Sequence, residues 1–327
     1  MKKLKNILMF DTSLGTRNLG DYIIRDSINN EMKYILDENF VVRCATHTPI
    51  CNFVNLLKKG PIYEYCKKAD YKFLCGTNIF KGTLLKINSD WAINLKSIPF
   101  YKKSIALGCG LGKNKKGYYD FYTKFIYKRI LSKEYYHSAR DEKTKEFIES
   151  LGFKAINTGC PTTWKLTSEH CKKIPKSKSK SVVFTLTDYS KNEKLDQELI
   201  NILTKEYSKV YYWPQGTGDL DYITKLKNIE NIEIIGPNLQ SYVDLLKKGN
   251  IDYVGTRLHG GIYAMQNYVR TIIIIIDNRA RDMKKTYNLN TIEREKISNL
   301  SELINSIFET KIKINEENIN KFKQQFK

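Results

Sequence analysis

The stretch IDYVGTRLHGGIYAMQNYVRTIIIIID, residues 251–277, decides the fold of this chain. It opens with a short apolar run ending at Val254, breaks at Gly255-Thr256, and continues with helical spacing as far as Gln266. A second apolar run then occupies residues 271–276. This pattern predicts a strand, a charged turn, a helix and a buried strand.

The predicted turn presents Arg257 and His259 one residue apart. In a parallel sheet the turn after a strand opens at the carboxyl edge, where the next helix also directs its unpaired amides. Glycines flank the pair and let a ligand approach the backbone. A solvated arginine and a structural histidine are the ordinary alternatives, but the flanking strand is too apolar for an exposed edge. We therefore predict an anion site here.

Strand and helix patterns alternate along the whole chain. In the first half, strands are predicted at residues 6–10, 41–45, 71–75, 104–107 and 135–139. In the second half, they are predicted at residues 182–186, 210–213, 232–235, 251–254 and 271–276. A lysine- and serine-rich segment with Pro175 separates the halves and reads as a linker.

The predicted fold class is therefore α/β, with two doubly wound Rossmann-like domains facing a cleft. A length of 327 residues also favours two domains over one. We place an N-terminal domain at residues 1–165, the linker at 166–180, and a C-terminal domain at 181–327 that ends in helices.

The charge balance limits the partners. The chain has 55 basic and 35 acidic residues and a net charge of +20, which favours anionic partners such as nucleic acid, acidic lipid headgroups or phosphorylated small molecules. The basic residues are scattered among acidic ones and no recognition motif accompanies them, so we expect no nucleic-acid partner. Apolar runs are too short for a signal peptide or a membrane span. A cytoplasmic protein, peripheral at most on the inner face of the membrane, is expected.

Cysteine and histidine usage gives little sign of a metal site. The cysteines show no C-x-x-C spacing and are expected to be reduced and mostly buried: Cys44, Cys51, Cys66, Cys75, Cys109, Cys160 and Cys171. None of the four histidines has a second ligand at a useful helical spacing. We expect no bound metal.

Further candidate residues follow other predicted strands. Asn18-Leu19-Gly20-Asp21 precedes a helix, where Asn and Asp are also ordinary caps. Arg140-Asp141 follows the fifth strand, and Asp141 is equally well placed as an N-cap. The glycine-rich run at residues 108–112 has the wrong spacing for a dinucleotide fingerprint and suits a tight turn. Gln215, in a strand-end loop, is a weak candidate for binding a sugar.

Several of these segments resemble the polysaccharide pyruvyltransferase family. GTRLHGGIYAMQ, residues 255–266, followed by an apolar strand and Asp277, is similar to the family's C-terminal signature with its Arg-x-His pair. The run at residues 18–21 resembles the amino-terminal motif, and SARDEKT, residues 138–144, resembles the Arg-Asp motif. The chain departs from the family in keeping one glycine, Gly76, of a glycine-rich loop, and in having Arg279 where a lysine is usual.

The resemblance implies a GT-B-like fold and a substrate site. In that site Arg140, Arg257 and Arg279 would bind substrate, and His259 would be catalytic. Asn18, Gly20, Asp21 and Gly76 would complete it.

The implied reaction moves the pyruvyl group of phosphoenolpyruvate onto a sugar of a surface polysaccharide or its lipid-linked precursor. A cyclic ketal forms and phosphate leaves. Phosphoenolpyruvate is the donor substrate and no cofactor is expected. Arg140 and Arg257 would hold its phosphate and carboxylate bidentately, and His259 would shuttle protons.

Two other functions fit the same residues. A nucleotide-sugar-dependent GT-B glycosyltransferase would place Arg257 and Arg279 on the diphosphate and would prefer a sugar nucleotide to phosphoenolpyruvate. A non-catalytic anion-binding or nucleic-acid-binding protein would show steeply salt-dependent affinity without turnover.

Overall fold

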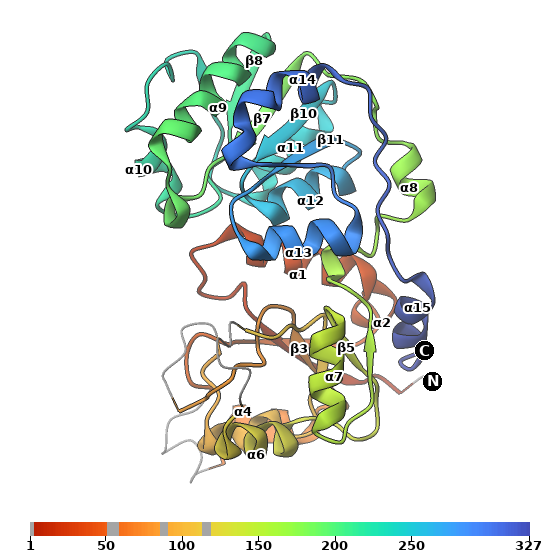
Figure 1. Cartoon of the computed structure of the whole chain (residues 1–327). Coiled ribbons are helices and arrows are strands. Elements are labelled where there is room, and N and C mark those ends of the chain that lie inside the picture. The colour runs from red at the N-terminus through yellow and green to blue at the C-terminus, as the bar shows by residue number, and fades with distance from the viewer. Residues whose placement is uncertain (1–2, 51–58, 86–90, 113–118) are drawn as a thin grey trace. The chain divides into compact units, whose positions relative to one another are not determined.

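A computed structural model describes residues 3–50, 59–85, 91–112 and 119–327. Its contacts divide the chain into two compact units, each described here by itself (Figure 1). Unit 1 comprises Met1–Thr16, Ile24–Trp164 and Asn315–Lys327, and unit 2 comprises Arg17–Ile23 and Lys165–Ile314. The expected interdomain cleft, and a shared site of Arg140 and Arg257, stay predictions.

This division differs from the predicted boundaries in three places. The expected linker belongs to unit 2 and contains α8 (Ser168–Lys172). The short segment Arg17–Ile23 also groups with unit 2. The C-terminal helix α15 (Glu316–Gln324) groups with unit 1, because Phe326 just beyond it packs edge-on against the rings of Tyr71 and Phe73.

Unit 1 is built on a parallel sheet with the order β2-β1-β3-β4. The strands are β1 (Asn6–Asp11), β2 (Phe40–Ala45), β3 (Tyr71–Cys75) and β4 (Ile105–Leu107). A second parallel pair, β5 (His137–Ala139) and β6 (Ala155–Asn157), is joined to this sheet by a bridge between Cys109 and Ala139. The helices are α1 (Leu19–Glu31), which starts in unit 2, α2 (Lys33–Leu36), α4 (Pro61–Lys68), α5 (Ile98–Tyr101), α6 (Phe121–Ile130) and α7 (Glu142–Ser150), with short 3-10 helices η1 (Leu95–Ser97) and η2 (Pro161–Thr163).

Unit 2 is built on a six-stranded parallel sheet with the order β12-β11-β10-β7-β8-β9. The strands are β7 (Ser181–Thr185), β8 (Lys209–Tyr212), β9 (Ile232–Ile234), β10 (Ile251–Gly255), β11 (Arg270–Ile275) and β12 (Thr291–Glu293). The helices are α8, α9 (Glu193–Glu206), α10 (Asp219–Ile223), α11 (Leu239–Lys247), α12 (Leu258–Gln266), α13 (Asn278–Tyr287) and α14 (Leu300–Asn305), with 3-10 helices η3 (Asp188–Ser190) and η4 (Arg294–Asn299).

The chain order of the strands in unit 2 reverses direction between β7 and β10. From β7 the chain adds β8 and β9 on one side, then returns to add β10, β11 and β12 on the other. Such a reversal is a topological switch point, where the connections leave a crevice at the carboxyl ends of the strands. All six residues of β11 are buried, as expected for a strand covered on both faces. The predicted class, two doubly wound Rossmann-like α/β units, is confirmed.

Cysteines in the described part of the chain match the expectation. Cys51 lies outside the described residues, and the other six are free and buried. Burial raises the pKa of the Cys109 thiol to about 12, so this thiol stays protonated at neutral pH.

His137 is a structural histidine of unit 1. Its side chain is fully buried, its Nδ1 accepts from the Ala106 amide at 3.0 Å, and its Nε2 lies 2.9 Å from the Ser132 carbonyl oxygen. Because an amide must donate and a carbonyl must accept, the proton sits on Nε2 and the ring is neutral. Burial lowers the pKa of this imidazole to about 4.

This histidine makes folding stability depend on pH. Its pKa is near 6.5 in the unfolded chain and about 4 in the folded one, so the unfolded chain gains the proton first as pH falls. The stabilisation is complete above pH 6.5 and falls toward pH 4, by up to about 3 kcal/mol. Urea denaturation at pH 7 and 4.5 measures it. In His137→Gln the loss between these two pH values should be smaller than in wild type, and an equal loss would contradict the assignment.

Candidate functional site

The candidate site of unit 2 starts where β7 and β10 end side by side. Gly255 pairs with Thr185, the Thr256 amide donates to the Thr185 carbonyl at 3.1 Å, and the Arg257 amide donates to Oγ1 of Thr185 at 3.2 Å. A Cβ added at Gly255 would lie 2.3 Å from that Oγ1, so only glycine fits this position. The pairing places the turn that carries Arg257 at the carboxyl ends of β7 and β10, the topological switch point of unit 2.

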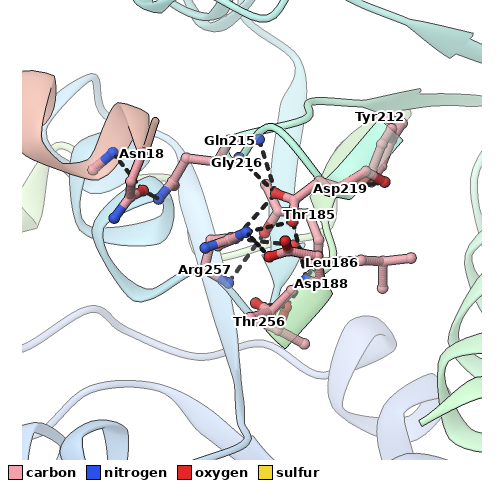
Figure 2. Close-up of polar contacts among 12 residues, drawn as sticks. Asn18, Thr185, Leu186, Asp188, Tyr212, Gln215, Gly216, Asp219, Thr256 and Arg257 are labelled. Atoms are coloured by element: carbon pink, nitrogen blue, oxygen red, sulfur yellow. Dashed lines mark hydrogen bonds and ion pairs between the residues drawn. The ribbon is translucent and has the colours of Figure 1, made fainter. Parts of the chain in front are cut away.

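Arg257 is buried and its side chain is held by two carboxylates (Figure 2). Nε donates to the Leu186 carbonyl and to Oδ2 of Asp219, each at 3.1 Å. Nη2 donates to Oδ1 of Asp188 at 3.0 Å and to Oδ1 of Asp219. Asp219 therefore takes the Nε/Nη2 fork, one of the donor pairs with which Arg257 was expected to hold phosphoenolpyruvate bidentately. The guanidinium can offer a ligand only its remaining group, Nη1, which no described residue accepts from.

Asp219 organises the loops after β7 and β8. It is fully buried and also accepts from the amides of Gln215 at 3.1 Å, Gly216 at 2.8 Å and Asp188 at 3.0 Å. Burial raises the pKa of the Asp219 carboxyl, an effect that Arg257 and these amides oppose. For Arg257 burial acts to lower the pKa, but the attraction of Asp219 and Asp188 outweighs it and raises the pKa. The guanidinium therefore stays charged.

Helix α12 begins directly after Arg257 with an open amino end. No side chain caps this end, and the first intrahelical bond runs from the Gly261 amide to the Arg257 carbonyl at 3.1 Å. Uncapped amides at a helix amino end attract anions through their partial positive charge. Because Asp188 and Asp219 more than offset the charge of Arg257, these amides are a main source of attraction for an anion here.

His259 lies in the first turn of α12. It is close to the segment at residues 18–21, which we call the Asn18 turn. A Cβ added at Gly20 would lie 3.3 Å from Nδ1 of His259, and 3.1 Å from both Oδ1 of Asn18 and Nε2 of Gln215. Asn18 forms a β-bridge with Gly216, and the Leu19 amide donates to the Gln215 carbonyl at 2.9 Å. The structure therefore brings Asn18, Gly20 and His259 together within unit 2, although they are far apart in the sequence.

The side chain of Gln215 carries an unpaired acceptor. Oδ1 of Asn18 accepts from the Gly20 amide at 3.0 Å and from Nε2 of Gln215 at 3.1 Å, which fixes the orientation of the Gln215 amide. Its Oε1 is buried and has no hydrogen-bond partner among the described residues. Unpaired buried acceptors are costly and are a feature of functional sites.

Asp21 and Arg279 have less defined roles. Asp21 is half-buried in the first turn of α1, and its amide donates to the Asn18 carbonyl at 3.1 Å. Arg279 is exposed in the first turn of α13, whose N-cap is Asp277, with Oδ1 accepting from the Ala280 amide at 2.8 Å. A substrate contact by either residue stays a prediction.

Arg140 and Gly76 lie in unit 1. Nη2 of Arg140 donates to Oδ1 of Asn78 at 2.7 Å. A Cβ added at Gly110 would lie 2.4 Å from the same Nη2. The glycine-rich turn therefore makes room for Arg140, and Asp141 is the N-cap of α7. Gly76 has a φ of +69°, and its added Cβ would lie 2.7 Å from Cγ2 of Ile24, so backbone conformation and packing account for this glycine.

Sequence reasoning missed the two carboxylates around Arg257. Asp188 and Asp219 each follow a predicted strand within a few residues, in TLTDY and WPQGTGD. An acid after a strand at the carboxyl edge was the available signal. Among the described residues, no group of three or more histidines, cysteines or acids is placed to hold a metal. In the same part of the chain, no helix combines the length and apolarity needed to cross a membrane.

A family model for polysaccharide pyruvyl transferases matches residues 18–278. The chain belongs to the polysaccharide pyruvyl transferase family. The resemblance noted in the sequence is thus confirmed, and the match includes both the Asn18 turn and the Arg257-x-His259 pair. No curated protein sequence matches the chain significantly.

Solved structures of other proteins share the fold. UDP-GlcNAc 2-epimerase from Methanocaldococcus jannaschii matches with a TM-score of 0.56 and 13% identity, over 98% of each chain. A putative UDP-N-acetylglucosamine 2-epimerase from Listeria monocytogenes matches with a TM-score of 0.53 and 14% identity, over 98% of this chain and 91% of the other. At such identities the likeness concerns the fold alone, which is GT-B-like as expected.

Proposed function

We propose that this member of the family transfers the pyruvyl group of phosphoenolpyruvate to two hydroxyls of a sugar. The sugar would belong to a surface polysaccharide or its lipid-linked precursor, and the reaction would take place in the cytoplasm. The observation that carries the proposal is the position of His259 at the open amino end of α12, at the switch point of unit 2.

The reaction needs an anion site beside a proton carrier. The methylene carbon of phosphoenolpyruvate gains a proton, the neighbouring carbon is attacked by two sugar hydroxyls, and the phosphate leaves with its bridging oxygen. The α12 amides and Nη1 of Arg257 supply donors for the anion. His259 supplies an imidazole, the type of side chain that commonly acts as a general acid and base.

The Asn18 turn and Gln215 supply polar groups for the sugar. Oε1 of Gln215 is an acceptor without a partner among the described residues, and a sugar hydroxyl is a matching donor. Because Oε1 is buried, the Gln215 side chain would have to shift slightly before a sugar hydroxyl could donate to this oxygen.

Phosphate release tests the proposal. With phosphoenolpyruvate, release should require a saccharide acceptor and should saturate in both substrates. A panel of acceptor sugars, free and lipid-linked, is compared with a reaction lacking acceptor. UDP-sugars in place of phosphoenolpyruvate should give no transfer. Transfer from a UDP-sugar, with none from phosphoenolpyruvate, would overturn the proposal in favour of a glycosyltransferase.

A further inference from the structure

Helix α6 of unit 1 has two chemically distinct faces. Its buried residues are Thr123, Ile126, Tyr127 and Ile130. The opposite stripe, at spacings of three and four residues, consists of Phe121, Lys124, Phe125, Lys128 and Arg129. Phe121 is 83% exposed, whereas an aromatic ring normally avoids water. The solvent face of this helix therefore presents the exposed ring of Phe121 among basic residues and has no acidic residue, while Phe125 is half-buried against the core.

Two more exposed apolar side chains flank the amino end of α6. Leu85 is 69% exposed and Leu95 is 54% exposed. The Leu84 amide donates to Oγ1 of Thr123 at 2.8 Å, and the Leu95 amide donates to the Tyr122 hydroxyl at 3.2 Å. The first bond ties the residue before Leu85, and the second ties Leu95 itself, to side chains of the first turn of the helix. We call the stripe of α6 together with Leu85 and Leu95 the α6 surface; the helix lies at the periphery of unit 1 (Figure 1).

The charged residues of the α6 surface and of the sequence beside it, in residues 91–112 and 119–133, are basic apart from Asp120. Lys96, next to Leu95, is exposed, as are Lys124, Lys128 and Arg129. The Arg129 guanidinium lies 4.9 Å from the centre of the Phe125 ring. In the described residues 91–112 and 119–133 the single acid is Asp120, whose carboxylate accepts from the amide and hydroxyl of Thr123. Asp120 is thus one acid among seven basic residues, so these two stretches keep a net positive charge.

We propose that the α6 surface docks unit 1 on a membrane whose headgroups are anionic. Exposed apolar side chains among basic residues combine apolar burial with electrostatic attraction to anionic lipids, the two contributions that hold a protein segment at a bilayer surface. Phe121, Leu85 and Leu95 enter the headgroup region, and the basic residues contact lipid phosphates. Peripheral contact of this kind requires no spanning helix.

Vesicle sedimentation tests this surface without any substrate, so its outcome is independent of the proposed reaction. Wild-type protein should bind vesicles that contain phosphatidylglycerol, and should not bind vesicles of phosphatidylcholine alone. Raising the salt to about 1 M should release it, because the screening length falls to about 3 Å. Equal binding to both vesicle types would overturn the proposal.

Variants locate the contact. Phe121→Ser should weaken binding about tenfold, and Lys124→Gln/Lys128→Gln about twenty-fivefold, at roughly fivefold for each charge near the surface. The matched control is Phe40→Ser, which removes another exposed phenylalanine of unit 1, 61% exposed and located on β2. The control should bind as wild type does. An unchanged affinity in the α6 variants, or an equal loss in Phe40→Ser, would overturn the assignment. Tighter binding of the wild-type protein to single-stranded RNA than to the anionic vesicles would also overturn it.

Discussion

Replacing His259 with Asn should lower the turnover of phosphoenolpyruvate by about a hundredfold or more, the usual scale of general acid–base catalysis. Asparagine keeps a polar side chain of similar reach, but it cannot carry a proton near neutral pH. The affinity for phosphoenolpyruvate should change little, because the α12 amides and Arg257 are unaffected. Steady-state kinetics, together with the shift in melting temperature that phosphoenolpyruvate causes, separates the two effects.

The matched control is His47→Asn, which changes a half-buried histidine of unit 1 outside the candidate site. The control should keep wild-type turnover. If His259→Asn unfolds, the histidine is structural. If it folds and turns over normally, another group moves the protons and the assignment of His259 is wrong.

Replacing Arg257 with Met should destabilise unit 2 by about 3–5 kcal/mol, the usual cost of breaking a buried ion pair. Methionine keeps most of the volume but leaves the Asp219 carboxylate fully buried without its cation. The loss should grow as pH rises above the pKa of that carboxyl. Urea denaturation of the wild type and the variant measures it.

The double variant Arg257→Met/Asp219→Asn sharpens this test. Asparagine has no charge to bury, and its carbonyl oxygen can still accept from the Gln215 and Gly216 amides, which both donate to Oδ2 of Asp219. It loses only the bond from the Asp188 amide, which donates to the other oxygen. Its stability should therefore exceed that of Arg257→Met. A single variant as stable as wild type would mean that the pair does not hold the loops after β7 and β8.

Local patterns predicted the central part of unit 2 well. The apolar run that became β11 is long, the short run that became β10 ends at a glycine, and the turn between β10 and α12 lies where the sequence placed it. Strand ends moved by a residue or so, as for β11, which starts at Arg270 because this side chain is buried against Asp252. β12 was not predicted, since it has three residues and one buried side chain.

Contacts between distant segments were beyond the sequence. Arg257 follows β10 and Asp219 lies in the loop after β8. These two strands lie on either side of β7 in the sheet, which brings the two side chains together. No local sequence pattern shows this strand order. The same is true of the Asn18 turn, which joins unit 2 through its bridge to Gly216. Sequence alone therefore proposed Arg257 as a site residue that binds substrate bidentately, whereas in the structure Asp219 takes its Nε/Nη2 fork.

The most direct test of the proposed reaction is the mass of the product formed in D2O. With phosphoenolpyruvate and a saccharide acceptor, the acceptor should gain the mass of pyruvic acid minus water, with one solvent deuterium in the new methyl group. That deuterium reports the protonation of the methylene carbon, and His259→Asn should form the product far more slowly. An acceptor that gains no such mass across the panel of sugars, or a product whose methyl group carries no deuterium, would contradict the account.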